Sequence, residues 1–209
     1  MRAMIAVVCG AALALVLGCS NSSSGPSMTP VSFAGTAVDS ATGAPVTSAA
    51  VAVAQNGVPV TSVTTGATDG TFTVANLPTG TGYAVEITKA GSEYVPTLYA
   101  PLTLNTDISG RFLEIFTQSE LLALMPTLTP PAAGTSTLLV YGINGAGALV
   151  PVSVVVGSLP ASPSNIPAVV TAIVPGAYTL TVTDSAGSVT IPNVQLTPDV
   201  FTVVNATVP

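Results

Sequence analysis

Residues 83–88 read YAVEIT, so large apolar side chains alternate with small or polar ones. An alternation of period two places one face of a β-strand in a core and the other face toward solvent. The same alternation occurs at residues 50–53 and 178–183, whereas helical periodicity is nearly absent beyond residue 33. The sequence therefore predicts an all-β protein.

Turn signals separate the alternating runs at short intervals. Asn-Gly and Asp-Gly pairs favour hairpin turns, because their residues tolerate positive φ angles. Short strands separated in this way are typical of an antiparallel sandwich. Tyr83 and Tyr178 each follow a turn, and we expect both to bury their rings and donate their hydroxyls to the backbone. The turn signals stand at residues 40–43, 55–57, 68–70, 78–80, 144–145 and 175–176.

One segment departs from the strand pattern. Residues 117–125 read TQSELLALM, with Thr117 and Glu120 at the spacing of a capping box and Pro126 after the last residue. This pattern predicts a short helix. Residues 127–135 follow and are rich in proline, which predicts a linker.

The halves on either side of this linker share motifs in the same order. Residues 77–83 read LPTGTGY, and residues 174–178 read VPGAY. Motifs repeated in order indicate a duplicated unit. We therefore expect two tandem antiparallel β-sandwiches, at residues 32–126 and 136–209, with the short helix between them.

The N-terminus has the layout of an export signal. Arg2 precedes an apolar run at residues 3–17, which is shorter than the roughly 20 residues that a bilayer span needs. The run ends in Leu17-Gly18-Cys19, which resembles the lipobox of bacterial lipoproteins. This resemblance implies a lipoprotein signal peptide at residues 1–18 and lipidation of Cys19.

Composition and charge extend this interpretation. Residues 19–31 are rich in serine and predict a flexible tether. Ser20 follows the cysteine in place of an aspartate, which by resemblance implies the outer membrane of the bacterial cell envelope, with the membrane as partner through the lipid anchor. Nine acidic and three basic residues give a net charge of −6, so we expect no nucleic acid partner.

The first half also carries the motifs of a known family. They occur in order as GTAVD at 35–39, TGAPV at 42–46, AVAV at 50–53, TDGTF at 68–72 and LPTG at 77–80. This order resembles the carboxypeptidase regulatory-like domain, a seven-stranded sandwich similar to transthyretin and of the immunoglobulin-like kind. The second half lacks the TDGTF motif and resembles a degenerate copy. In the namesake carboxypeptidases this domain lies beside the catalytic unit, so the resemblance implies a non-catalytic accessory module.

The sequence offers little material for a catalytic or metal site. It contains no histidine, which excludes a histidine-dependent triad and the common zinc sites. Asp39 and Asp69 stand on motif turns, where they either hydrogen-bond the turn backbone or hold a cation. The turn role is favoured because no Asp-x-Asp-x-Asp run is present, and the same two carboxylates are the only formal basis for hydrolysis. We expect no catalytic residue, no metal ion and no cofactor.

Two tyrosines leave a second function open. Tyr94 and Tyr99 lie outside the clean alternation and flank Pro96. Either they form a small exposed patch for sugar contact, or both pack beneath a loop or an edge strand. The primary expectation is a lipid-anchored, non-catalytic envelope protein that acts as a binding or accessory module, with an envelope protein or polysaccharide as partner. The alternative is a carbohydrate-binding surface lipoprotein of the starch-binding kind.

Overall fold

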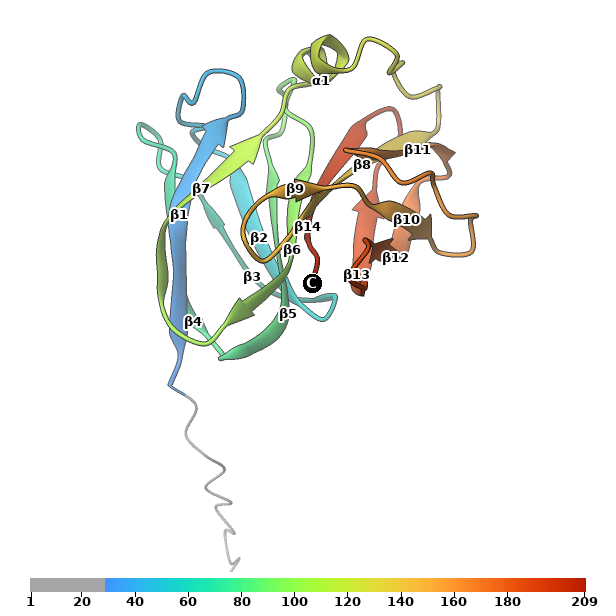
Figure 1. The fold of residues 1–209 in the computed structure, drawn as a ribbon. Coiled ribbons are helices and arrows are strands. Elements are labelled where there is room, and N and C mark those ends of the chain that lie inside the picture. The colour runs from blue at the N-terminus through green and yellow to red at the C-terminus, as the bar shows by residue number, and fades with distance from the viewer. Residues whose placement is uncertain (1–28) are drawn as a thin grey trace, which may run out of the picture.

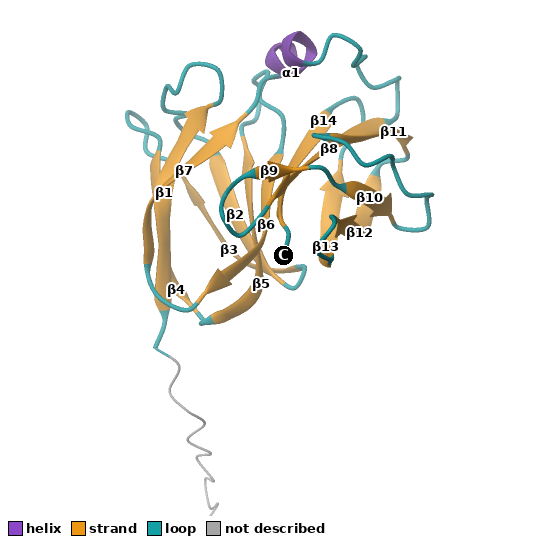
Figure 2. Cartoon of the chain, in the orientation of Figure 1, coloured by secondary structure: helices purple, strands orange, loops and turns teal. Residues whose placement is uncertain are grey.

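A computed structural model describes residues 29–209 and shows a chain of strands with one short helix (Figure 1; Figure 2). The all-β prediction is confirmed for this part of the chain. The predicted signal peptide at residues 1–18, the predicted lipidation at Cys19 and most of the predicted tether at residues 19–31 lie outside the described residues.

The strands of residues 29–209 form three sheets. The first covering sheet has the order β4-β1-β7, with β1 at Val31–Asp39, β4 at Thr71–Leu77 and β7 at Ile108–Ile115. The second covering sheet has the order β10-β12-β13, with bounds Ser153–Val156, Gly176–Thr183 and Ser188–Leu196.

The long sheet runs in the order β11-β8-β14-β6-β5-β2-β3, and the short β9 pairs with β8. Its strands are β2 (Ala50–Gln55), β3 (Val58–Thr64), β5 (Gly80–Thr88), β6 (Thr97–Leu104), β8 (Ser136–Ile143), β9 (Leu149–Val150), β11 (Ala168–Ile173) and β14 (Phe201–Thr207).

The same pairing scheme occurs twice along the chain. β1 pairs with β4 antiparallel and with β7 parallel, and β8 pairs with β11 antiparallel and with β14 parallel. The antiparallel run β2-β5-β6 has its counterpart in β10-β12-β13. Tyr83 and Tyr178 occupy equivalent places in β5 and β12, and their hydroxyls donate to the carbonyls of Pro78 and Val174, as expected. The Tyr83 ring is fully buried, whereas Tyr178, which we also expected to be buried, is only half-buried. The motif repeat in the sequence thus has a counterpart in strand order.

Two features differ from the expected pair of tandem antiparallel sandwiches. First, the β1–β7, β8–β14 and β6–β14 pairings are parallel. Second, β6 and β14 hydrogen-bond to each other, so one sheet continues across the predicted linker at residues 127–135. Alternation tells which face of a strand is buried but says nothing about the direction or identity of its neighbour. The division into separate units at 32–126 and 136–209 stays a prediction.

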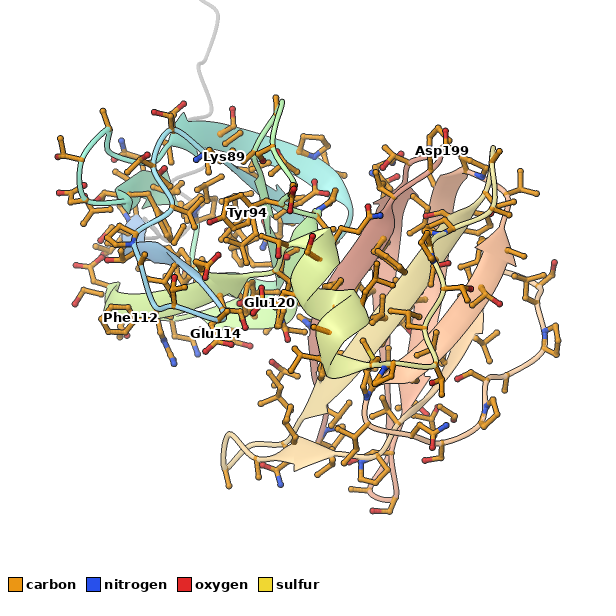
Figure 3. The ribbon with its side chains drawn as sticks, turned by 90° about the horizontal axis from the view of Figure 1, so that it is seen from above. Lys89, Tyr94, Phe112, Glu114, Glu120 and Asp199 are labelled. Carbon is orange, nitrogen blue, oxygen red and sulfur yellow. The ribbon has the colours of Figure 1, made fainter. Side chains whose placement is uncertain are left out.

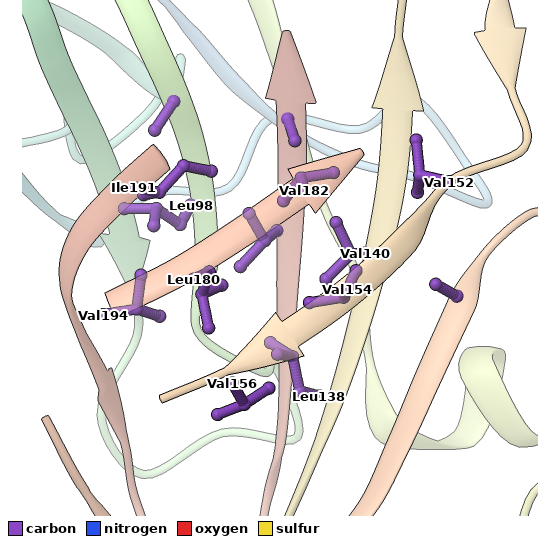
Figure 4. Close-up of a cluster of buried hydrophobic side chains, with 14 of the residues drawn as sticks. Leu98, Leu138, Val140, Val152, Val154, Val156, Leu180, Val182, Ile191 and Val194 are labelled. Carbon is purple, nitrogen blue, oxygen red and sulfur yellow. The ribbon is translucent and has the colours of Figure 1, made fainter. Parts of the chain in front are cut away.

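β6 serves two cores, one on each of its faces. Leu98 and Ala100 belong to the core under the second covering sheet, whereas Tyr99 packs against the core under the first. The covering sheets therefore lie on opposite faces of the long sheet. Figure 1 shows them at the left and the right, with β6 and β14 between them. Figure 4 shows Leu98 among side chains of the second half, close to Ile191.

The two main cores are built from alternating strand positions. The first core includes Val51, Val53, Phe72, Val74, Tyr83, Val85, Ile87 and Leu104. The second core includes Leu138, Val140, Val154, Val156, Leu180, Val182, Ile191 and Val204. No disulfide is needed to account for two such cores, because burial of this much apolar surface is the dominant favourable term in folding.

The helix α1 (Gln118–Leu124) closes a third, smaller core. Its N-cap is Thr117, and the capping box with Glu120 is present in both directions, which confirms the helix prediction. Leu121 is fully buried against Leu139 and Phe201 of the long sheet. None of the residues from 29 to 209 belongs to a helix with the length and apolar character of a membrane span.

Candidate functional site

Asp39 forms a hydrogen-bonded turn at the end of β1. Its Oδ1 accepts from the Thr42 amide at 2.9 Å and from the Thr42 hydroxyl at 2.7 Å, and its Oδ2 accepts from the Tyr94 hydroxyl at 2.9 Å. Partial burial acts to raise the pKa of Asp39, but the hydrogen bonds from Thr42 and Tyr94 outweigh it and lower this pKa below its ordinary value. Two residues singled out for different reasons in the sequence are thus in direct contact.

Asp69 forms a second turn of the same kind. Its Oδ1 accepts from the Thr71 amide at 3.1 Å and from the Thr71 hydroxyl at 2.9 Å, and these bonds lower the pKa of the exposed carboxyl. Within residues 29–209 no three His, Cys, Asp or Glu side chains gather in a way that could hold a metal ion. The geometry of Asp39 and Asp69 accounts for the turns, and a cation at either carboxyl stays a prediction.

Tyr94 and Tyr99 are used differently. The Lys89 ammonium lies 5.5 Å from the centre of the Tyr94 ring, and Figure 3 shows these two residues close to each other. Burial and the hydrogen bond to Asp39 raise the pKa of Tyr94 to about 12. The Tyr99 hydroxyl instead donates to the Glu114 carbonyl at 2.7 Å, and burial raises its pKa. Both rings pack against the first core, so sugar contact by this pair stays a prediction.

Tyr99 takes part in a row of three side chains that sequence reasoning missed. In register, Tyr99 on β6 lies beside Asn205 on β14, and Asn205 lies beside Tyr141 on β8. The Asn205 side chain is buried, and its Nδ2 has no hydrogen-bond partner. A buried amide that lacks a partner is uncommon, because its desolvation is not compensated. The row therefore presents an unused donor between two aromatic rings.

This row lies in a cleft ringed by exposed apolar side chains. Phe112 is 72% exposed, Leu124 61% and Leu149 54%, and all three line the same hollow of about 440 Å³. We call this hollow the Phe112 cleft; it is lined by Tyr99, Phe112, Leu124, Tyr141, Leu149 and Asn205, with others. Figure 3 shows Phe112 and Glu114 at the outer side of the first half.

Other contacts extend and stiffen the cleft. A neighbouring hollow of about 470 Å³ shares Tyr99, Phe112 and Ile143 with it. The Tyr141 ring stacks on Phe116 with centroids 6.0 Å apart and planes 6° from parallel. Burial, with a smaller effect from the negative charge of Glu120, raises the pKa of Tyr141. The aromatic side of the cleft is therefore held in place by packing.

The sequence did contain one indication that the Phe112 side chain is exposed. Residues 112 and 113 are Phe and Leu, and successive side chains of a strand point to opposite faces. Leu113 is buried in the first core, so Phe112 has to face outward. Tyr141 and Asn205 gave no comparable signal, since their role depends on which strands become neighbours.

Comparison with known proteins gives structural likenesses only. No protein-family model matches the chain, and no curated protein matches it. The chain is similar to the TIE protein of Bacillus anthracis, with 15% identity and a TM-score of 0.34 over 86% of this chain and 34% of that one. It is similar to a streptococcal ancillary pilin, with 12% identity and a TM-score of 0.32 over 88% of this chain and 64% of that one. It is also similar to a minor pilin of Streptococcus agalactiae, with 14% identity and a TM-score of 0.29 over 86% and 97% of the two chains. The chain thus spans about a third of the first of these proteins and just under two thirds of the second.

Proposed function

We propose that this chain is a non-catalytic binding module of the bacterial cell envelope, held at the membrane by a lipid on Cys19, and that the Phe112 cleft contacts an envelope protein. The observation that carries this proposal is the cleft itself, with Phe112, Leu124 and Leu149 exposed around the unused Asn205 amide. The lipobox resemblance at residues 16–19 supports the anchor.

The chemistry of the cleft suits a protein partner. Clustered exposed apolar side chains mark interaction sites, and an aromatic anchor in a hollow is the usual centre of binding energy at a protein interface. The Asn205 Nδ2 is an unused donor just beneath this surface. Binding of a partner would cover Phe112, Leu124 and Leu149.

The carboxylates considered for hydrolysis have roles in turns and do not line the Phe112 cleft. Asp39 and Asp69, the carboxylates considered for hydrolysis, accept hydrogen bonds from their own turns. The sequence contains no histidine to act as a base. These facts support contact over catalysis, in line with the accessory role that the carboxypeptidase regulatory-like resemblance implies.

A second candidate partner is an envelope polysaccharide, favoured by the Tyr99–Asn205–Tyr141 row. Rings and an amide donor side by side suit both the face and the hydroxyls of a sugar. In this form the carbohydrate alternative rests on Tyr99, which lines the Phe112 cleft, and moves away from Tyr94, which does not line it.

Crosslinking in intact cells tests the proposal. A photoreactive residue at Leu149, on the rim of the cleft, is expected to capture one reproducible protein, identified by mass spectrometry. Capture should be lost in the Phe112→Ser variant and retained in Val58→Ser, which changes a side chain that is 65% exposed on β3. Identical neighbours in both variants would show that the cleft is not the contact surface.

A glycan panel separates the second candidate from the first. The chain has no tryptophan and five tyrosines, so tyrosine emission reports on the rings. Soluble polysaccharides are expected to change this emission in the parent chain and in Val58→Ser but not in Tyr141→Leu. No change with any polysaccharide, together with a captured protein, would decide for the protein partner.

The anchor has its own test. Cys19→Ala is expected to leave an uncleaved or mislocalised precursor, because position 19 then carries no sulfur for lipidation. Cys9→Ala is the matched control, since the predicted cleavage removes Cys9 with the signal peptide. Unchanged membrane retention and unchanged mass in Cys19→Ala would refute the anchor and leave the Phe112 cleft untouched.

A further inference from the structure

A second hollow lies on the opposite face of the long sheet, between the two halves of the chain. It has a volume of about 440 Å³ and a mostly apolar lining. We call it the Glu86 groove, lined by Ala52, Ala54 and Ala84 on its floor, Val60 on one wall, Val194 on the other, and Glu86 and Thr202. Leu98 and Glu86 are cross-strand neighbours, which places the groove on the Leu98 face of β6 and away from Tyr99.

Small side chains explain why this space is open. Ala52 pairs with Glu86, and Ala54 pairs with Ala84, so the floor between β2 and β5 carries little bulk. Alanine projects only a methyl group, and three of them leave a depression that larger side chains would fill.

The groove is closed at one end by a contact between the halves. The Asn193 amide on β13 donates to the Gly57 carbonyl at 2.8 Å, across 136 positions of sequence. Gly57 has a φ of 79°, and a Cβ there would lie 3.0 Å from the Asn193 Cβ. Only glycine suits this approach, so the wall provided by β13 is fixed against the β2–β3 turn.

Two polar groups in the groove lack partners. The Glu86 carboxyl makes no hydrogen bond and no ion pair with any residue in the described part of the chain, and burial raises its pKa. The Thr202 side chain is 1% exposed, and its Oγ1 also has no hydrogen-bond partner. Thr202 lies two residues before Val204, which pairs with Leu98, so its side chain shares the Leu98 face with Glu86.

We propose that the Glu86 groove binds an organic cation: a molecule with an apolar body that fills the floor and a primary ammonium group that pairs with Glu86. The ammonium supplies three donors, which suit the two oxygens of the carboxylate. A carboxylate removed from water gains most from an opposite charge brought into contact with it. The net charge of −6 favours the approach of cations from solution.

This ligand site is independent of the Phe112 cleft. The two hollows lie on opposite faces of β6 and share no lining residue. A variant that empties one therefore leaves the other in place.

The test uses the full-length protein and n-hexylammonium, with n-hexanol and hexanoate as probes of equal chain length. The readout is the NMR signal of the Ala52, Ala54 and Ala84 methyl groups. Hexylammonium is expected to shift these signals and to saturate, and Glu86→Gln is expected to weaken its Kd by about tenfold or more, since hydrogen bonds to charged groups are the strong ones. Glu114→Gln, which removes an exposed carboxyl elsewhere, should leave the Kd unchanged.

The pH dependence of binding provides a second test. Glu86 is the one titratable residue among those that line the groove, so affinity should fall as the pH drops through its pKa. Equal affinity for hexanol, equal loss in Glu114→Gln, or alanine signals that do not move would each overturn the proposal.

Discussion

At the scale of single residues, Gly70 combines a positive φ with a lack of space for a side chain, whereas Gly91 has only the positive φ. The φ of Gly70 is 65°, and a Cβ there would lie 2.8 Å from the Ala37 carbonyl oxygen. Gly91 has almost the same φ, 67°, but a Cβ there would meet nothing within 4 Å. The pair separates the cost of backbone strain from the cost of a steric clash.

Gly70→Val is therefore expected to destabilise the protein more than Gly91→Val. The strained φ alone costs about 1–3 kcal/mol, and at position 70 the displacement of β1 adds to it. Thermal unfolding of both variants measures the difference. Equal losses at the two positions would show that the Ala37 contact gives way freely.

Glu86 predicts a pH effect whose sign is fixed by burial. Its folded pKa lies above the ordinary 4.5, so between these two values the folded state holds more protons than the unfolded state. Stability therefore falls as the pH rises through that window. Glu86→Gln is expected to raise the Tm at pH 7 by about 1–4 °C and to match the parent chain below the ordinary pKa. The Glu114→Gln control should show no such gain, and a lower Tm for Glu86→Gln at pH 7 would mean that the carboxylate has a stabilising partner.

Hydrogen bonds between residues that are only a few positions apart in the sequence were predictable. Asp39 bonds Thr42 and Asp69 bonds Thr71, and both contacts follow from local turn chemistry. Asn205 is different, because its importance depends on a row formed with strands about 60 and 100 positions earlier. No local pattern carries that information.

At the scale of elements, α1 depends on its first turn. The Thr117 hydroxyl accepts from the Glu120 amide at 3.2 Å, and the Glu120 carboxylate accepts from the Thr117 amide at 3.2 Å. Thr117→Ala is expected to cost about 1 kcal/mol, because the Glu120 N–H loses the hydroxyl that accepts from it. Thr127→Ala, an exposed position beyond the helix, is the control. Chemical denaturation measures the free energy of unfolding of both variants. An equal loss of stability in Thr127→Ala would show that the helix cap is not the cause.

The helix was predictable and β6 was not, for related reasons. A capping box and a proline mark the ends of α1 locally. β6 reads TLYAPLTL, in which Leu98 and Tyr99 both pack against cores on opposite faces. A strand with apolar residues on both faces shows no alternation of apolar and polar side chains, so a search for a period of two does not find it.

At the scale of the whole molecule, the parallel pairing of β6 with β14, which we call the β6–β14 seam, couples the stabilities of the two halves. Leu98 belongs by sequence to the first half but packs in the second core. Leu98→Ala is expected to cost about 2–4 kcal/mol and to raise hydrogen exchange in β10 and β12 of the other half. Val53→Ala, within the first core, should raise exchange in β2 and β5 first. Two separate unfolding transitions in the parent chain would contradict this coupling.

The repeat could be read from the sequence, whereas the seam could not. Matching motifs before Tyr83 and Tyr178 reflect matching turns, and turns are local. The seam depends on β6 leaving its edge open and β14 filling it. An open strand edge and a paired one have the same side-chain pattern, since the difference lies in backbone groups that every residue possesses.

β14 lies between β6 and β8, parallel to both, although a ribosome makes it after either of them. A chain delivered with its N-terminus first thus exposes the rim of β6 for the time needed to add about a hundred further residues. An exposed rim recruits any extended segment nearby, including that of a sister molecule. Folding of the long sheet is therefore complete only when β14 has been added. A chain truncated before Phe201 is expected to aggregate through the open edge of β6 rather than to remain a soluble, partly folded monomer.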